Sequence, residues 1–144
     1  MNWISYRSKK SKPDANTRMN TNDANKILYK DESYKLTGIF FKIHNRLGRF
    51  LKEKQYADEL ENFLKNEKVN YKREFSLDKL SDIKGNRLDF LVDNKIIVDI
   101  KAKRIITKED YYQMLRYLRT SDLKLGLFVN FRNTYLKPKR IINL

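Results

Sequence analysis

The chain has 144 residues, of which 40% are hydrophobic and 12% aromatic, so it can build one domain with a core and is not a disordered chain. Its 32 Lys and Arg residues against 18 Asp and Glu residues give a formal charge of +14, which favours a polyanionic partner, nucleic acid before an anionic membrane. There is no cysteine, which excludes disulfides, zinc–thiolate sites and cysteine nucleophiles.

Residues 1–35 are rich in Ser, Lys, Asn and Asp and show no sustained hydrophobic period. We expect a basic, mobile N-terminal arm, which either holds nucleic acid or another partner or is a loosely packed extension without a specific role. No apolar run reaches the roughly 18 residues of a membrane span, and the first residues lack the apolar core of a secretory signal. We therefore expect an intracellular protein without a membrane partner, cytoplasmic if its source is prokaryotic.

Residues 36–144 form the predicted domain, which begins with a helical layer in two pieces. The first piece starts at Leu36, and Gly48 marks the break before the second. Apolar residues of the first piece recur at helical spacing: Ile39, Phe40, Ile43, Leu47. His44, the one histidine of the chain, shares this face, so it is either a hydrogen-bonded core residue or a weak ligand candidate.

Glu53 lies on the face of the second helical piece that continues as an apolar stripe from Tyr56. A carboxylate near a core needs a partner. Glu53 either sits at the helix start, where the macrodipole and water stabilise it, or shares a metal ion with Asp89 and Asp99.

A predicted strand over 69–77 is followed by a predicted hairpin over 87–101. Pairing Val92 with Ile96 across a three-residue turn gives the hairpin a continuous apolar face. The further pairs on that face are Phe90 with Val98 and Leu88 with Ile100. A register shifted by one residue would pair apolar residues with carboxylates, so side-chain matching selects this alignment.

The other face of the hairpin then places Asp89 opposite Asp99 and Arg87 opposite Lys101. Like charges facing each other in a sheet are destabilising unless a cation lies between them, and oxygen ligands on a rigid scaffold suit Mg²⁺ or Mn²⁺. The sequence therefore predicts a metal site here. The alternative is a solvated surface on which Lys101 and Arg87 neutralise the two carboxylates.

Residues 107–110 have the pattern of a capping box and open a predicted helix that ends near Ser121. Its apolar stripe consists of Tyr111, Met114, Leu115 and Leu118. Gln113 and Tyr117 are one turn apart and flank this stripe. They either orient a phosphate or a metal-bound water, or are ordinary boundary residues.

Residues 125–129 are a nearly continuous apolar run, as expected of a strand buried on both faces and reached by a right-handed crossover. A last strand or extension over 136–142 contains Pro138, which places it at a sheet edge.

This order of elements resembles the αβββαβ core of the PD-(D/E)xK nuclease superfamily, and within it the group named for a GxxExxY motif. The similarity covers about residues 36–143. Its strongest stretches are "LTGIFFKIHNRLG", "EKQYADELENFL", "RLDFLVDNKIIVDIKA", "QMLRYL", "LKLGLFVNF" and "LKPKRIIN". The resemblance implies an α/β, restriction-endonuclease-like fold with a mixed central sheet flanked by helices.

The resemblance also implies roles for individual residues. By position, Asp89 is the first acidic ligand of the motif, Asp99 is the second, and Lys101 is its lysine. Glu53 and Tyr56 are the Glu and Tyr of GxxExxY. Gln113 and Tyr117 resemble the QxxxY element of RecB-like nucleases. Two positions depart from the pattern. Phe50 stands where the motif has its first glycine, and Asp99 stands where close relatives usually have Glu.

The implied activity is metal-dependent hydrolysis of phosphodiester bonds, with DNA favoured over RNA. One or two Mg²⁺ or Mn²⁺ ions would be held by Glu53, Asp89, Asp99 and the backbone carbonyl of Ile100. Lys101 would orient or deprotonate the water, while Gln113 and Tyr117 would position the substrate or the lysine. Arg87 and the basic arm would attract DNA, and Tyr56 and His44 are weaker candidates for contact with it.

A different class of function stays open, namely a nuclease-fold module that binds nucleic acid or another partner without cleaving it. The departures at Phe50 and Asp99 favour this alternative, and the retained carboxylates and lysine argue against it. A homodimeric assembly also stays open.

Overall fold

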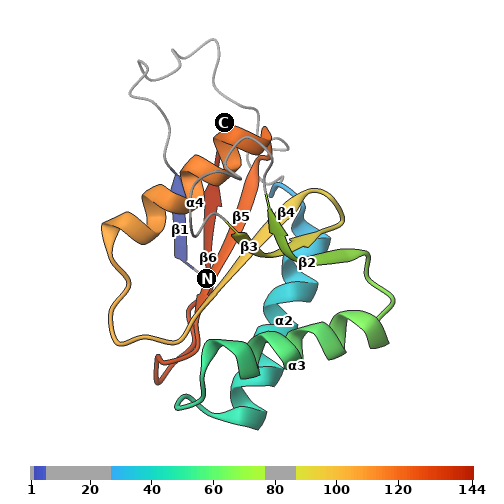
Figure 1. Ribbon diagram of the computed structural model, residues 1–144, viewed down its shortest axis with the longest axis vertical. Helices are drawn as coiled ribbons and strands as arrows, with labels where there is room; N and C mark the ends of the chain where they lie inside the picture. The colour runs from blue at the N-terminus through green and yellow to red at the C-terminus, as the bar shows by residue number, and fades with distance from the viewer. Residues whose placement is uncertain (1, 6–26, 77–86) are drawn as a thin grey trace.

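The computed structural model describes residues 2–5, 27–76 and 87–144. The predicted mobility of the arm falls largely on residues 6–26 and lies outside the described residues. The elements run along the chain as follows: β1 Asn2–Ser5, α2 Lys30–Leu47, α3 Glu53–Asn66, β2 Tyr71–Ser76, β3 Arg87–Val92, β4 Ile96–Lys101, α4 Lys108–Ser121, β5 Leu125–Asn130 and β6 Lys139–Ile142 (Figure 1).

The strands form one mixed sheet in the order β1-β6-β5-β4-β3-β2. The pairs β2–β3, β3–β4 and β5–β6 are antiparallel, whereas β4–β5 and β1–β6 are parallel. This arrangement confirms the predicted α/β fold with a mixed central sheet. In the described part of the chain, no helix is both long enough and apolar enough to cross a membrane.

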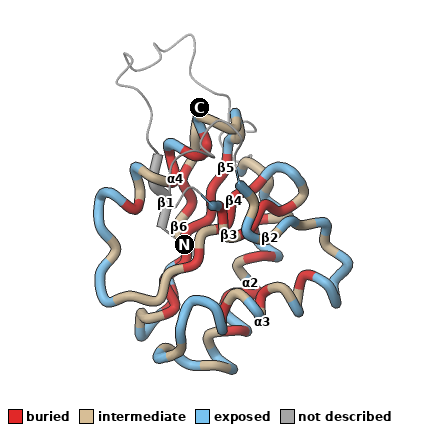
Figure 2. Tube along the Cα trace, viewed as in Figure 1, coloured by how far each residue is buried: buried red, intermediate tan, exposed pale blue. Residues whose placement is uncertain are grey.

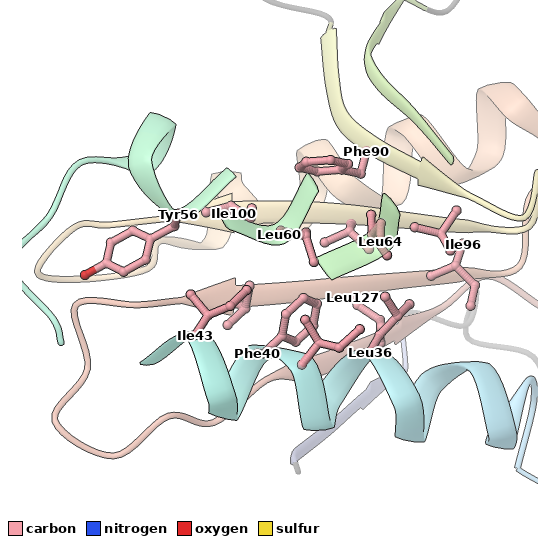
Figure 3. Close-up of a cluster of buried hydrophobic side chains, with 14 of the residues drawn as sticks. Leu36, Phe40, Ile43, Tyr56, Leu60, Leu64, Phe90, Ile96, Ile100 and Leu127 are labelled. Atoms are coloured by element: carbon pink, nitrogen blue, oxygen red, sulfur yellow. The ribbon is translucent and has the colours of Figure 1, made fainter. Parts of the chain in front are cut away.

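The sheet is covered on both faces, and each face has its own hydrophobic core. One core joins α2 and α3 to the sheet and includes Phe40, Leu60 and Phe90 (Figure 3). The other joins α4 to the opposite face and includes Met114, Leu118 and Phe128. Because β5 lies between both layers, its six residues are all buried (Figure 2), as the continuous apolar run predicts.

The hairpin has the predicted register next to its turn, with Phe90 opposite Val98 and Val92 opposite Ile96. The strand pairing ends there, so the pairs predicted beyond it, such as Asp89 with Asp99 and Arg87 with Lys101, are not strand pairs. Asp93 and Asn94 in its turn both have a φ of 54°, a left-handed conformation that Asp and Asn tolerate better than most residues.

The prediction that Leu88 shares the apolar face of Phe90 is wrong. Leu88 packs in the α4 core. The pairing of β2 with β3 passes over Glu74 and Asp89, and Glu74 has a φ of 53°. This interruption twists the start of β3. As a result Leu88 and Phe90, which are two residues apart and would share a face in a regular strand, lie on opposite faces of the sheet.

The first helix begins at Lys30, six residues before the expected start at Leu36. Asp31 and Glu32 stabilise its first turn through the helix dipole. Ser33 is buried beneath the guanidinium of Arg140, to which it is hydrogen-bonded. This polar segment is therefore a helical turn that packs against β6, which its composition does not indicate.

The last strand is not at the edge of the sheet, because β1 pairs with β6 on its outer side. The expectation rested on Pro138, which cannot donate a hydrogen bond within a sheet. Pro138 instead lies immediately before β6, where its missing N–H interrupts no strand pairing.

Candidate active site

The hairpin brings two carboxylates together at the place where β3 and β4 separate. The side chains of Asp89 and Asp99 are hydrogen-bonded to each other. Asp89 Oδ2 also accepts a hydrogen bond from the backbone N–H of Ile100 at 2.7 Å. The Asp89 side chain thus takes a backbone donor of β4 beyond the last β3–β4 pair, which fixes its carboxylate beside Asp99.

Burial and the hydrogen bond with Asp89 raise the pKa of Asp99 well above its usual value of 3.8. The side chain of Asp99 is only 13% exposed, and its Oδ2 lies 3.5 Å from the Nζ atom of Lys101. The lysine partly offsets the effect of the neighbouring carboxylate. Two carboxyl groups that share a hydrogen bond need a proton between them, so this pair resists carrying its full negative charge.

Burial lowers the pKa of Lys101, but the negative charge of Asp99, followed by that of Glu53, outweighs it. The net result is a raised pKa, and Lys101 is a cation at neutral pH. Because the charge of Glu53 raises the pKa of Lys101, Glu53, the first residue of α3, lies near this part of the hairpin.

Glu53 and Asp89 line one cavity of about 180 Å³. The backbone and side chains that complete its wall belong to Lys54, Ala57, Arg73, Glu74 and Ile100. Glu53 itself is exposed at the first position of α3, where the helix dipole and water stabilise it. Glu53 is therefore at a solvated helix start, as the first of its two predicted environments has it, and it also lines the same cavity as Asp89.

Within the described residues, no three His, Cys, Asp or Glu side chains are grouped closely enough to hold a metal ion. The donor chemistry nevertheless fits a divalent cation. Asp89 and Asp99 place two carboxyl groups side by side, and a cation bound between them would offset their mutual repulsion. Glu53 is exposed and lines the cavity next to Asp89, so its carboxylate adds an oxygen donor to the same cavity.

The helix α4 contributes Gln113 and Tyr117 from the other side of the sheet. Gln113 Nε2 donates a hydrogen bond to Tyr117 Oη at 2.8 Å. Burial, and next the charge of Asp99, raise the pKa of Tyr117. The structure thus places Tyr117 within electrostatic reach of Asp99 and Lys101, with Gln113 holding its hydroxyl.

Three other predicted candidates lie differently. Tyr56 has no exposed surface, and its hydroxyl donates to Gly48 O at 2.6 Å and accepts from Leu51 N at 3.2 Å. It therefore supports the α2–α3 loop and is not available for contact with nucleic acid in this structure. Its hydroxyl is directed away from the core, towards that loop (Figure 3).

His44 is half-buried, with Nε2 2.8 Å from the backbone oxygen of Asn133. A carbonyl can only accept a hydrogen bond, so Nε2 carries the proton. In this structure His44 is therefore a hydrogen-bonded histidine. Arg87, in contrast, is exposed at the start of β3 and lies 4.0 Å from Glu74.

Sequence reasoning missed Asn130 and Lys103, whose side chains stabilise the segment after Lys101. Asn130 Oδ1 accepts from Lys103 N, and its Nδ2 donates to Lys103 O at 2.7 Å. The Nζ atom of Lys103 lies 2.6 Å from Asp110 Oδ2, in the capping box that Asp110 forms with Thr107. The signal for Asn130 is present in the sequence, since it ends an otherwise apolar strand.

One family model matches the chain. It is described as the PD-(D/E)XK nuclease superfamily, and it matches residues 30–141. The match begins at the first residue of α2 and ends within β6, so it spans the sheet from β2 to β6, the three helices and every candidate site residue. No curated protein and no solved structure matches the chain.

Proposed function

The chain belongs to the PD-(D/E)XK nuclease superfamily, and from this premise we propose that it is a metal-dependent nuclease that cleaves phosphodiester bonds of nucleic acid, with DNA favoured over RNA. In this reaction a water attacks phosphorus, one P–O ester bond breaks, and the leaving oxygen takes up a proton. We assign the chain to the GxxExxY group on the resemblance of Glu53 and Tyr56 to its motif.

The observation that carries the proposal is the pair Asp89 and Asp99 beside Lys101. A binding module gains nothing from two hydrogen-bonded carboxyl groups that disfavour each other's charge, since such a pair costs stability. A catalytic site retains this arrangement because it can bind a cation. The pair is also held in place, by the N–H of Ile100 on Asp89 and by Lys101 on Asp99.

The residues that would hold Mg²⁺ or Mn²⁺ are Glu53, Asp89, Asp99 and the backbone carbonyl of Ile100. When bound, such an ion would lower the pKa of a water molecule and neutralise charge on the phosphate. Asp99 has the shorter of the two acidic side chains found at this position in the superfamily, and its hydrogen bond to Asp89 shows that it still reaches its partner carboxylate.

Lys101 provides a positive charge at the carboxylate pair. Because its pKa is raised, it keeps its proton at neutral pH and donates hydrogen bonds to the scissile phosphate or to the attacking water. Tyr117, held by Gln113, lies on the α4 side and positions the lysine or the substrate.

The net charge of +14 supports attraction of the phosphate backbone without recognition of sequence. The exposed Arg87 at the start of β3 is one such contact in this proposal.

A second candidate function is a nuclease-fold module that binds nucleic acid without cleaving it. The observation that favours it is that the described residues contain no ready group of three metal-binding side chains. The two proposals differ in one measurable property, which is cleavage in the presence of a divalent cation.

The test uses the purified full chain with supercoiled plasmid, linear duplex DNA, single-stranded DNA and RNA, each in Mg²⁺, Mn²⁺ or EDTA. The variants are Asp89→Asn and Lys101→Ala. Their matched controls, Asp93→Asn and Lys95→Ala, change the same residue types at the opposite end of the hairpin, in its turn.

Cleavage that requires the metal, is lost in both site variants and is kept in both controls would support the nuclease. Binding by the wild-type protein without cleavage in either metal would support the inactive module instead. Cleavage that persists in Asp89→Asn would contradict the assignment of the site.

A further inference from the structure

A surface of two arginines and one phenylalanine stands next to the proposed active site. We call it the stacking platform, and it consists of Arg49, Phe50 and Arg132. The first two residues lie in the loop between α2 and α3, and the third lies in the loop between β5 and β6. These loops are side by side at the lower end of the molecule in Figure 1.

The two loops are joined by a reciprocal pair of hydrogen bonds. Arg49 Nε donates to the backbone oxygen of Arg132 at 2.7 Å, and Arg132 Nε donates to the backbone oxygen of Arg49 at 3.1 Å. Each guanidinium is therefore held by its own Nε atom, which leaves the terminal nitrogens directed away from that contact. In the part of the chain that the structure describes, neither arginine forms an ion pair with an acidic side chain.

Phe50 lies close to both guanidinium groups yet remains open to solvent. The guanidinium carbon of Arg49 is 4.7 Å from the centre of the Phe50 ring, and that of Arg132 is 5.6 Å from it. Even so, 72% of Phe50 is exposed. A single exposed phenylalanine needs no explanation, but one that lies beside two arginines presents an aromatic surface together with positive charge.

The platform adjoins the carboxylate site through two connections. Phe50 precedes Glu53 by three residues, a separation of at most about 11 Å along the chain. On the sheet side, the N–H of Phe131 donates a hydrogen bond to the backbone oxygen of Lys101, the last residue of β4, at 2.9 Å. Arg132 is the next residue after Phe131, so its backbone lies close to the end of β4. A nucleotide chain that reaches the carboxylates can therefore also reach Phe50.

Exposed aromatic rings beside arginines are the features with which proteins bind single-stranded nucleic acid. Bases stack on the ring or on the guanidinium plane, and the cations contact phosphates. In a duplex the faces of each base are covered by its neighbours, so a base can stack on a protein ring only where it is unpaired or displaced from the helix.

We propose that Arg49, Phe50 and Arg132 bind an unpaired nucleotide of the strand that is cleaved, so that the preferred substrate is single-stranded DNA. This inference rests on the proposed nuclease function, because it assumes that the carboxylate site acts on nucleic acid. It assigns to Phe50 a binding role at the position where the GxxExxY motif has glycine.

The test measures binding in EDTA, so that it does not depend on cleavage. A fluorescein-labelled oligonucleotide of about 12 nucleotides, single-stranded or annealed to its complement, is titrated with the full chain and followed by fluorescence anisotropy. The variants are Phe50→Ala and Phe50→Tyr, and the matched control is Phe41→Ala, which removes another exposed phenylalanine from the middle of α2.

Phe50→Ala should weaken binding of the single strand by about 5- to 100-fold, the range for loss of one base stack. It should change duplex binding by less than about twofold. Phe50→Tyr should keep single-strand affinity because tyrosine offers the same ring, and Phe41→Ala should keep it as well. All variants should unfold at nearly the same temperature, because neither side chain belongs to the core.

A second measurement uses single strands that lack one base at successive positions. The wild-type protein should lose affinity at a particular position, and Phe50→Ala should not. Unchanged single-strand binding by Phe50→Ala, an equal loss for single strand and duplex, or a wild-type protein that binds neither would overturn the proposal.

The two proposals fail separately. Wild-type protein that binds single strands through Phe50 but cleaves no substrate in Mg²⁺ or Mn²⁺ supports the platform and contradicts the nuclease. Cleavage by wild-type protein together with unchanged binding by Phe50→Ala supports the nuclease and overturns the platform.

Discussion

The carboxyl groups of Asp89 and Asp99 are hydrogen-bonded to each other at the point where β3 and β4 part. Asp89 is fixed by the N–H of Ile100, and Asp99 lies 3.5 Å from Lys101. Two acidic groups this close stabilise the fold best when one of them is protonated. Ionising both groups is therefore unfavourable, which is common where a protein retains residues for function at a cost to stability.

Asp99→Asn should stabilise the protein in EDTA. The pKa of Asp99 is raised in the folded state, so the unfolded chain releases this proton at a lower pH than the folded chain. The wild-type protein thus loses stability as the pH rises from below 3.8, the usual aspartate value, through the raised value. An amide cannot ionise, and its N–H can donate to Asp89. We expect a melting temperature at pH 7 that is higher by about 2–6 °C, or roughly 1–2 kcal/mol.

The measurement is thermal unfolding of both proteins across the acidic and neutral range. Below the usual aspartate pKa the two melting temperatures should converge, and the difference should grow as the pH rises. Asp93→Asn in the hairpin turn serves as the control and should follow the wild-type curve. A lower melting temperature for Asp99→Asn at neutral pH would contradict the argument. The same substitution should abolish metal-dependent cleavage.

Tyr56→Phe should disconnect the α2–α3 loop from the core. The Tyr56 ring is stacked on Phe131 at 4.3 Å between ring centres, and phenylalanine keeps that contact. The hydroxyl, however, serves both Gly48 O and Leu51 N, and both bonds are lost. We expect a destabilisation of about 1–2 kcal/mol and weaker cleavage, since this loop leads directly to Glu53.

The control for Tyr56→Phe is Tyr71→Phe, which removes a hydroxyl hydrogen bond to Glu61 on an edge strand away from the carboxylates. It should lower stability slightly and leave the rate of cleavage unchanged. Urea unfolding and cleavage rates of both variants distinguish the two effects. Equal loss of cleavage in both would show that Tyr56 has no particular influence on the site.

Gln113 should act through Tyr117. The amide of Gln113 donates to the Tyr117 hydroxyl, and that hydroxyl lies in the field of Asp99 and Lys101. Gln113→Leu and Tyr117→Phe should each lower kcat by about 10-fold or more, within the range for loss of one positioned polar group. The double variant should be hardly worse than Tyr117→Phe alone. Effects that multiply in the double variant would show that the two residues act independently.

The hairpin is the part of the site that the sequence specifies best. Its apolar residues allow one register, and Asp89 and Asp99 come together just beyond the last pair of that register. The capping box at Thr107 and the buried strand β5 are likewise present where local pattern predicts them. These features depend on contacts between near neighbours in the chain or on uniform burial.

The features that could not be predicted depend on contacts between distant segments. Arg140 is buried against Ser33, which is 107 residues away, and this contact gives the polar start of α2 its place in the fold. The change of face at Leu88 follows from the left-handed conformation of Glu74 on the neighbouring strand. The reciprocal bonds between Arg49 and Arg132 also join loops with no common local pattern.

Gly126 should control how closely α4 approaches the sheet. A Cβ atom at this position of β5 would lie 2.5 Å from the sulfur of Met114 and 2.9 Å from its Cγ, so Gly126→Ala must displace that side chain. We expect a destabilisation of about 1–3 kcal/mol, as for other overpacked cores. Cleavage should also fall, because α4 carries Gln113 and Tyr117.

Shortening the opposing side chain tests whether the clash is the cause. Met114→Ala alone should cost about 2–5 kcal/mol because it leaves a cavity, but in that background Gly126→Ala should cost little, since the added methyl group enters the space. Gly38→Ala is the matched control, because a Cβ atom there meets nothing within 4 Å and alanine favours a helix. Urea unfolding of the four proteins gives the coupling. Strictly additive losses would mean that Met114 is not what excludes a side chain at residue 126.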